Sequence, residues 1–187
     1  MYASSIGDSI AIETLRFYIS NVQLFKNDAL VYALPQKHLL IDMEVPESMQ
    51  IHLPEQAELR YDKIKFNIGV DSVTSVSGAF GGDLDPTNGM YWTWQSGYIN
   101  FKLEGKTPLC PARKHQFQYH IGGYQPPYNT LQTVELVVSN SKKIRLEMAL
   151  DQLLTQVNVS ENFQVMSPNQ QAVDMAEVIA TIFTITE

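Results

Sequence analysis

The feature that most constrains this chain is an alternation of apolar and polar side chains with a period of two, which recurs along most of its 187 residues. This period places alternate side chains on opposite faces of a β-strand. In the clearest stretch, Lys63–Val70, Ile64 and Phe66 point one way while Lys65 and Asn67 point the other. The stretch therefore predicts a strand with one face on a core and one face toward water.

Similar alternation predicts about nine strands in all. The other eight stretches are Leu15–Leu24, Ala29–Leu34, His38–Met43, Gln50–Leu53, Ile99–Leu103, Phe117–Ile121, Val134–Val138 and Ile144–Leu150. Within the first of these, the apolar phase shifts around Asn21, which predicts a bulge or bend. Two sheets of short strands cover each other's apolar faces, so we expect an all-β fold, an immunoglobulin-like β-sandwich.

The end of the chain departs from the period of two. Apolar residues recur at helical spacing from Ala172 to Phe183, Ser167 can cap a helix, and Pro168 suits the first helical position. We expect a short C-terminal helix that packs on an edge or end of the sheets. No linker or internal repeat divides the chain, so a single domain over residues 1–187 is expected.

Charge and composition exclude several classes of protein. Thirteen Lys and Arg face 20 Asp and Glu, and the net charge of -7 disfavours nucleic acid or anionic lipid as a partner. No stretch reaches the roughly 18 apolar residues of a membrane span, and residues 1–8 lack the features of a signal peptide. The single cysteine, Cys110, excludes an internal disulfide, a Cys-based zinc site and a CxxC centre.

The segment Phe80–Glu104 has an unusual composition. A glycine-rich loop at Gly81–Gly89 is followed by five aromatic residues, among them both tryptophans of the chain, Trp92 and Trp94. In an extended segment the two indoles share a face with Met90. One interpretation is a buried aromatic belt where the loop returns to the core. The other is a binding surface.

Three histidines have informative parity, meaning their odd or even position relative to the apolar residues of the same stretch. His38, His52 and His120 alternate with the apolar positions of their stretches, so they lie on polar faces. One interpretation is solvated surface imidazole. The alternative is a metal site built across strands, because histidine is the commonest protein ligand and two sheets bring distant residues together. Neither an HxH nor an HExxH spacing is present.

Two other groups of residues are functional candidates. Asp83, Asp85 and Asn88 offer oxygen ligands to a cation such as calcium, although Asp-Pro is also ordinary turn chemistry. Cys110 lies near His115, without the local signature of a catalytic cysteine. GxSxG, P-loop and GxGxxG patterns are missing, so we do not expect an enzyme.

Several blocks of the chain resemble a known family. The blocks are LRFYISNVQL (Leu15–Leu24), HLLID (His38–Asp42), KIKFNIGVD (Lys63–Asp71), LDPTNGMYWTWQSGYINFKLEG (Leu84–Gly105) and FQYHIGG (Phe117–Gly123). In order and content they are similar to the MbnP-like domain family, which has many members in Bacteroidetes. The family is named after the copper-binding protein encoded with methanobactin biosynthesis. The resemblance covers residues from about Gly7 to about Phe183 and includes the compositionally rare MYWTWQSGY block.

The resemblance implies an extracytoplasmic β-sandwich in the periplasm or at the cell surface, exported or anchored as a lipoprotein, with a leader absent from this chain. It also implies a copper site made by histidines and an oxidised tryptophan, kynurenine. His38 and His120 stand where the family has histidine, and Trp92 or Trp94 would be the oxidised indole. Where many relatives have a further histidine, this chain has Met166, whose thioether could serve Cu(I) instead.

The sequence is therefore compatible with two functions. The first is a non-enzymatic binding domain that holds copper as its cofactor through His38, His120, Trp92 and Trp94. The alternative is a structural or interaction module of the cell envelope with no metal site. In that case the aromatic residues around Tyr91, Trp92 and Tyr124–Tyr128 would form core, a surface for a protein partner or a surface for sugars.

Overall fold

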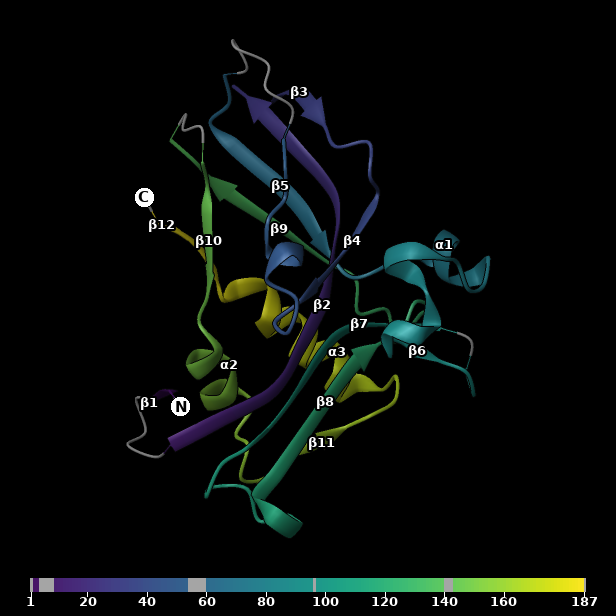
Figure 1. Ribbon diagram of the computed structural model, residues 1–187, viewed down its shortest axis with the longest axis vertical. Helices are drawn as coiled ribbons and strands as arrows, with labels where there is room; N and C mark the ends of the chain where they lie inside the picture. The colour runs from purple at the N-terminus through teal and green to yellow at the C-terminus, as the bar shows by residue number, and fades with distance from the viewer. Residues whose placement is uncertain (1, 4–8, 54–59, 96, 140–142, 187) are drawn as a thin grey trace.

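The computed structural model describes residues 2–3, 9–53, 60–95, 97–139 and 143–186. Its main element is a sheet of ten strands, joined by a separate antiparallel pair (Figure 1). The sheet consists of β1 (Tyr2–Ala3), β2 (Ser9–Lys26), β3 (Ala29–Ala33), β4 (His38–Asp42), β5 (Lys63–Ile68), β6 (Tyr91–Trp92), β7 (Gly97–Lys106), β8 (Gln116–Gly122), β9 (Gln132–Val137) and β11 (Gln164–Val165). The pair is β10 (Arg145–Met148) and β12 (Phe183–Thr186).

The long strand β2 organises the sheet and runs through most of the molecule in Figure 1. Along its first half one edge pairs with β7, and farther along the same edge pairs with β5. Strand β8 then joins β7, and β9 joins β5, so the sheet divides into two wings that share β2. Strands β4 and β3 pair with the other edge of β2. The prediction of an all-β, sandwich-like fold is confirmed.

The predicted bulge at Asn21 is present. Asn21 has a φ of 51°, and the pairing of β2 with β5 shifts register between Ser20 and Gln23. Before the bulge, Phe17 and Ile19 face the main core; after it, Val22 and Leu24 do. One extra residue thus lets a single strand keep its apolar side chains on the core while it passes from one wing to the other.

Two helices cover the inner face of the sheet. They are α2 (Leu150–Gln156) and α3 (Gln170–Thr181), and α3 contacts β8 and β9 (Figure 1). Their buried side chains join the main core cluster; they are Leu153, Leu154, Ala172, Met175, Ala176 and Ile179. In the part of the chain that the structure describes, no helix is long and apolar enough to cross a membrane.

Four local predictions were wrong. Residues 50–53 follow the short 3-10 helix η1 (Pro46–Met49) and form no strand, and Leu150 begins a helix instead of ending a strand. A few alternating residues do not distinguish an extended loop or a helix start from a strand. The cap of α3 is Asn169, whose side-chain oxygen accepts the backbone N–H of Ala172 at 2.8 Å. Phe183 lies past the helix, in β12.

Candidate functional site

A second, smaller core lies on the outer face of the sheet, which is the face opposite α2, α3 and the main core. Residues 71–95, here called the covering segment, fold over this face as α1 (Ser72–Val76), the 3-10 helices η2 (Gly82–Leu84) and η3 (Pro86–Asn88), and β6 (Figure 1). The buried members of this core are Tyr18, Val70, Leu84, Met90, Trp92, Tyr98 and Ile99. Leu84, Met90 and Trp92 of the covering segment therefore bury the outer face of β2 and β7, which alternation alone predicts to face water.

The two tryptophans have different environments. Trp92 is buried, and its six-membered ring lies over Gly122 of β8, where an added Cβ would lie 2.8 Å from Cζ3. Trp94 is 65% exposed, and its ring centroid lies 5.7 Å from that of Trp92. Met90 is fully buried. The expected common face of Met90 and both indoles is thus divided, with one indole in the core and one at the surface.

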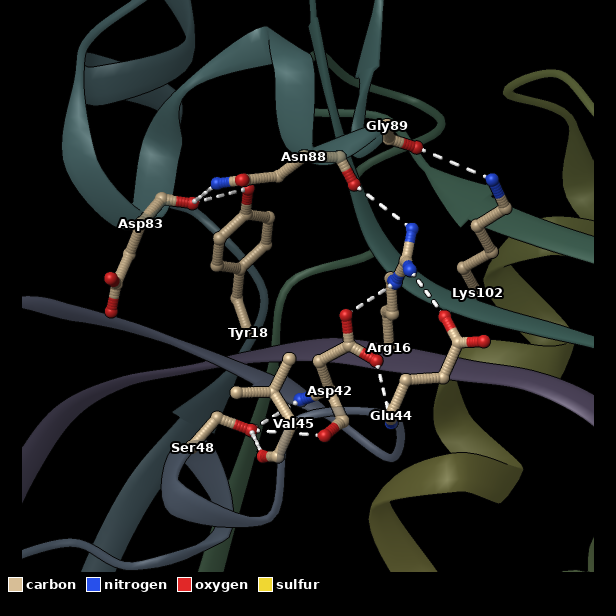
Figure 2. Close-up of polar contacts among 10 residues, drawn as sticks. All are labelled: Arg16, Tyr18, Asp42, Glu44, Val45, Ser48, Asp83, Asn88, Gly89 and Lys102. Carbon is tan, nitrogen blue, oxygen red and sulfur yellow. Dashed lines mark hydrogen bonds and ion pairs between the residues drawn. The ribbon is translucent and has the colours of Figure 1, made fainter.

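Hydrogen bonds of Arg16 join the covering segment to the sheet (Figure 2). Its Nε donates to Asp42 Oδ2 at 2.7 Å, and its Nη2 donates to Glu44 Oε2 at 2.7 Å. Its Nη1 reaches across to the carbonyl of Asn88 at 3.2 Å. Lys102 Nζ donates to the neighbouring carbonyl of Gly89 at 3.3 Å. Two cations on the sheet therefore hold the end of η3 in place.

The candidate calcium ligands Asp83, Asp85 and Asn88 form hydrogen bonds within the protein. Asp83 Oδ2 accepts the backbone N–H of Leu40 at 3.1 Å, and the Asp83 carbonyl accepts the Asn88 side-chain amide at 3.1 Å. Asp85 Oδ1 caps η3 by accepting from Thr87 N at 2.8 Å. Among the described residues, no group of three or more His, Cys, Asp or Glu side chains is arranged to hold a metal.

The hydroxyl of Tyr18 shares the Asp83 carbonyl with the Asn88 amide. It donates to that oxygen at 3.1 Å (Figure 2). Burial, with smaller contributions from Tyr98 and Asp83, raises the pKa of Tyr18 well above its usual value. Tyr18 therefore remains a neutral donor that joins β2 to the covering segment.

His38 is bound by a carboxylate. Its Nε2 lies 3.0 Å from Asp71 Oδ2, and the ring is largely buried. The other oxygen of Asp71 caps α1 by accepting from Thr74 N at 2.9 Å. The interpretation of His38 as solvated surface imidazole is wrong. Its ring ties β4 to the beginning of the covering segment.

His120 has a similar arrangement on β8. Its Nε2 lies 2.6 Å from Glu104 Oε1 on the neighbouring strand, and its ring is also largely buried. Burial lowers the pKa of His120, although the hydrogen bond to Glu104 acts in the opposite direction. In the neutral ring, Nε2–H donates to the carboxylate and the lone pair is on Nδ1. That is the state in which imidazole binds a metal.

The strand register separates the two histidines. His120 lies opposite Lys102, Lys102 opposite Arg16, and Arg16 opposite Asp42, so three strand spacings lie between β8 and β4. His38 lies four residues from Asp42 along β4. These spacings put the two Cα atoms roughly 15–20 Å apart. Ligand bonds near 2 Å require both rings to reach one ion. The structure therefore does not bring His38 and His120 to one metal.

On the β11 side of β8, Met166 is the residue closest in register to His120. Strand β11 runs parallel to β8 with Val165 opposite Tyr119, and Met166 directly follows this strand, so the register continued by one residue pairs its backbone with that of His120. Met166 is exposed, and its sulfur accepts a hydrogen bond from the side-chain amide of Gln164 at 3.3 Å. Trp92 covers Gly122, two residues beyond His120 on the same face. Sequence patterns do not reveal this pairing, because β11 has only two residues.

These residues define the candidate site. Glu104 binds His120, Met166 follows the neighbouring strand β11, and Trp92, which contacts Trp94, covers Gly122 two residues beyond His120; we call this set the His120 corner. The imidazole and the thioether are donors suited to a soft metal ion, and the carboxylate holds the imidazole.

Cys110 and His115 do not pair through the thiol. Cys110 is fully buried, and its Sγ donates to the carbonyl of Gln116 at 3.1 Å. His115 Nδ1 lies 2.9 Å from the Cys110 carbonyl oxygen. His115 is the last residue of the short 3-10 helix η4 (Arg113–His115), which leads into β8. Both groups are used to shape this turn.

Comparisons with known proteins agree with the observed fold. A protein-family model described as MbnP matches residues 1–171. Among solved structures, MbnP from Methylosinus trichosporium superposes with a TM-score of 0.50 at 14% sequence identity. The superposition covers 82% of this chain and 69% of that chain, and at this identity it shows the fold alone. The curated proteins contain no significant match to the chain.

Proposed function

Because the chain belongs to the MbnP family, we propose that it is a non-enzymatic, extracytoplasmic domain that binds copper at the His120 corner. Copper is the ligand that the family resemblance implies. The observation that supports this site is the register of β11 with β8, which, continued by one residue past the strand, pairs the backbone of Met166 with that of His120. His38 stays outside the site, bound to Asp71.

The donor chemistry fits the reduced ion. Imidazole nitrogen and thioether sulfur together suit Cu(I), because softer ligands favour the softer oxidation state. Glu104 holds the His120 ring through Nε2, and such a carboxylate fixes the orientation and tautomer of a ligating imidazole. His120 and Met166 would hold the ion, and Glu104 would position His120.

Trp92 and Trp94 are the aromatic residues of the His120 corner. Trp94 is exposed at the surface while Trp92 is buried beneath it, so Trp94 is the indole accessible to dioxygen and solvent. We propose Trp94 as the residue converted where kynurenine forms. Fragment-ion masses of the peptide that carries both tryptophans, from protein purified from its native cells, locate the converted residue and test this. Conversion at Trp92, with Trp94 intact, would contradict it.

A Cu(I) titration of the purified protein against a competing chelator such as bicinchoninate tests the copper site. We expect one ion per chain, with His120→Gln and Met166→Leu each lowering the affinity at least about tenfold. Glu104→Gln is expected to lower it by about tenfold, since it changes only the orientation of His120. His38→Gln is the matched control, because it removes an equally buried imidazole that lies outside the site.

The outcomes separate this proposal from its alternative. Affinity that is unchanged by His120→Gln, or is lowered equally by His38→Gln, would contradict the site. The second candidate function is a structural module of the cell envelope. It is favoured by the carboxylate partner that each of His38 and His120 already has. Absence of stoichiometric Cu(I) binding in the wild-type protein would support this alternative. Fractionation of native cells tests the extracytoplasmic location.

A further inference from the structure

We infer that this protein has a second binding site, for a neutral saccharide, in a pocket separate from the His120 corner. The pocket has a volume of about 510 Å³. It is lined by Tyr124, Tyr128, Gln95, Gln125 and three prolines, and we call it the tyrosine–proline pocket. Pockets of this volume accept ligands the size of one or two sugar rings.

Three separate segments form the pocket. Gln95 comes from the turn between β6 and β7, the two tyrosines come from the loop between β8 and β9, and Pro168 comes from the residues before α3. Gly123 permits their approach. It has a φ of 138°, and an added Cβ would lie 2.2 Å from the carbonyl oxygen of Tyr128 and 3.1 Å from Pro168 Cβ. The pocket therefore depends on a backbone conformation that glycine alone adopts readily.

The loop between β8 and β9 is held at its base. Thr130 N donates to the carbonyl of Gly123 at 3.0 Å and closes the loop. The buried Asn100 amide donates to Thr130 Oγ1 at 2.9 Å, and Ser72 Oγ donates to the carbonyl of Tyr124 at 2.8 Å. Because the loop is already ordered by these bonds, little conformational entropy remains to be lost when a ligand binds.

The lining of the pocket selects the chemistry of the ligand. None of the described residues that line it is charged, so a charged ligand would find no compensating group there. Tyr128 is 39% exposed, and Tyr124 is partly exposed. The electron-rich faces of these rings suit the C–H bonds on the apolar face of a hexose. Gln95 and Gln125 are exposed amides that both donate and accept hydrogen bonds, as sugar hydroxyls do.

A proline-rich peptide is the rival ligand, since aromatic-lined grooves also bind polyproline helices. A polyproline segment offers carbonyl acceptors and no backbone N–H donors. It would leave the acceptor oxygens of Gln95 and Gln125 unmatched, whereas hydroxyl groups satisfy both the donor and the acceptor of each amide. The two glutamines therefore favour the saccharide.

The test uses the full chain with two neutral disaccharides, cellobiose and N,N′-diacetylchitobiose, measured by saturation-transfer NMR and calorimetry. We expect saturable binding of at least one of them. Tyr128→Ala should lower its affinity about tenfold, and Tyr128→Phe, which keeps the ring, should lower it less. Gln125→Leu should also weaken binding. Phe80→Ala is the matched control, because Phe80 is a similarly exposed aromatic residue outside the pocket.

Three results would overturn the inference: no saturable binding of either disaccharide, binding unaffected by Tyr128→Ala and Gln125→Leu, or binding of a polyproline peptide in place of the sugars. Circular dichroism and Cu(I) titration of the same variants show whether they are folded. None of these substitutions touches the His120 corner, so loss of sugar binding with copper binding intact separates the two sites. Failure of the copper proposal alone would leave this one standing.

Discussion

The Arg16 guanidinium joins three parts of the molecule, and its removal is expected to loosen the covering segment from the sheet. Arg16 bonds Asp42 and Glu44 near the end of β4, and it bonds the carbonyl of Asn88 in η3. Arg16→Met keeps much of the aliphatic side chain and removes all three hydrogen bonds. The free energy of unfolding is therefore expected to fall.

The size of the effect follows from the exposure of each partner. The side chains of Arg16 and Asp42 are 23% and 10% exposed, so their bond contributes about 1.5–3 kcal/mol. Glu44 is 60% exposed, and its pair contributes about 0–1 kcal/mol. The bond to Asn88 O contributes about 1 kcal/mol. We expect Arg16→Met to cost about 3 kcal/mol, a value that includes the penalty of leaving Asp42 partly buried without its cation.

A double-mutant cycle isolates the main contact. Urea unfolding of the wild type, Arg16→Met, Asp42→Asn and the double variant, followed by tryptophan fluorescence, should give a coupling energy of about 1.5–3 kcal/mol. Lys102→Met is the control, since its contact with Gly89 O is longer and exposed. A coupling energy below about 0.5 kcal/mol would refute the reasoning, because distant residues show coupling of that size.

Two further predictions concern the aromatic cover and the buried histidine. Gly122→Ala would place a Cβ 2.6 Å from Tyr98 O and 2.8 Å from Trp92 Cζ3, so we expect a loss of about 1–3 kcal/mol in urea unfolding. Gly81→Ala, where a Cβ meets nothing within 4 Å, is the control, and equal stability of the two variants would contradict this. Burial lowers the pKa of His120 below its ordinary 6.5, with Glu104 and Lys102 as its charged neighbours, so the unfolded chain binds a proton first as pH falls. Stability should therefore decline as the pH drops below about 6.5, and His120→Gln should remove that part of the decline in unfolding measured from pH 7 to pH 5. An unchanged pH dependence in His120→Gln would show that other groups cause it.

Much of the fold is predictable from local patterns. The alternation in β5 matches the observed burial residue by residue, and the phase shift at Asn21 marks the observed bulge. The failures occur where the pattern is short. Residues 50–53 and Leu150 carry too few alternating positions to define a strand, and Ser167 and Asn169 are both acceptable caps until packing selects one.

The candidate site was only partly predictable. Parity correctly put His38 and His120 on the outer face of the sheet, and the resemblance to the family directed attention to them and to the tryptophans. Parity does not show that Asp71 and Glu104 bind those rings, or that β11, the strand before Met166, pairs with β8. The acidic partners come from residues 33 and 16 positions away, and no local pattern marks them.

The sequence by itself determined which side chains of each strand point to the same face, because that period is fixed by the local geometry of the extended backbone. Only the tertiary structure decided what lies against each face. The covering segment buries Tyr18 and Trp92, and the two-residue strand β11 pairs with β8. Strand pairing joins residues far apart in the chain, so the neighbours of a side chain depend on the whole fold and not on its local pattern.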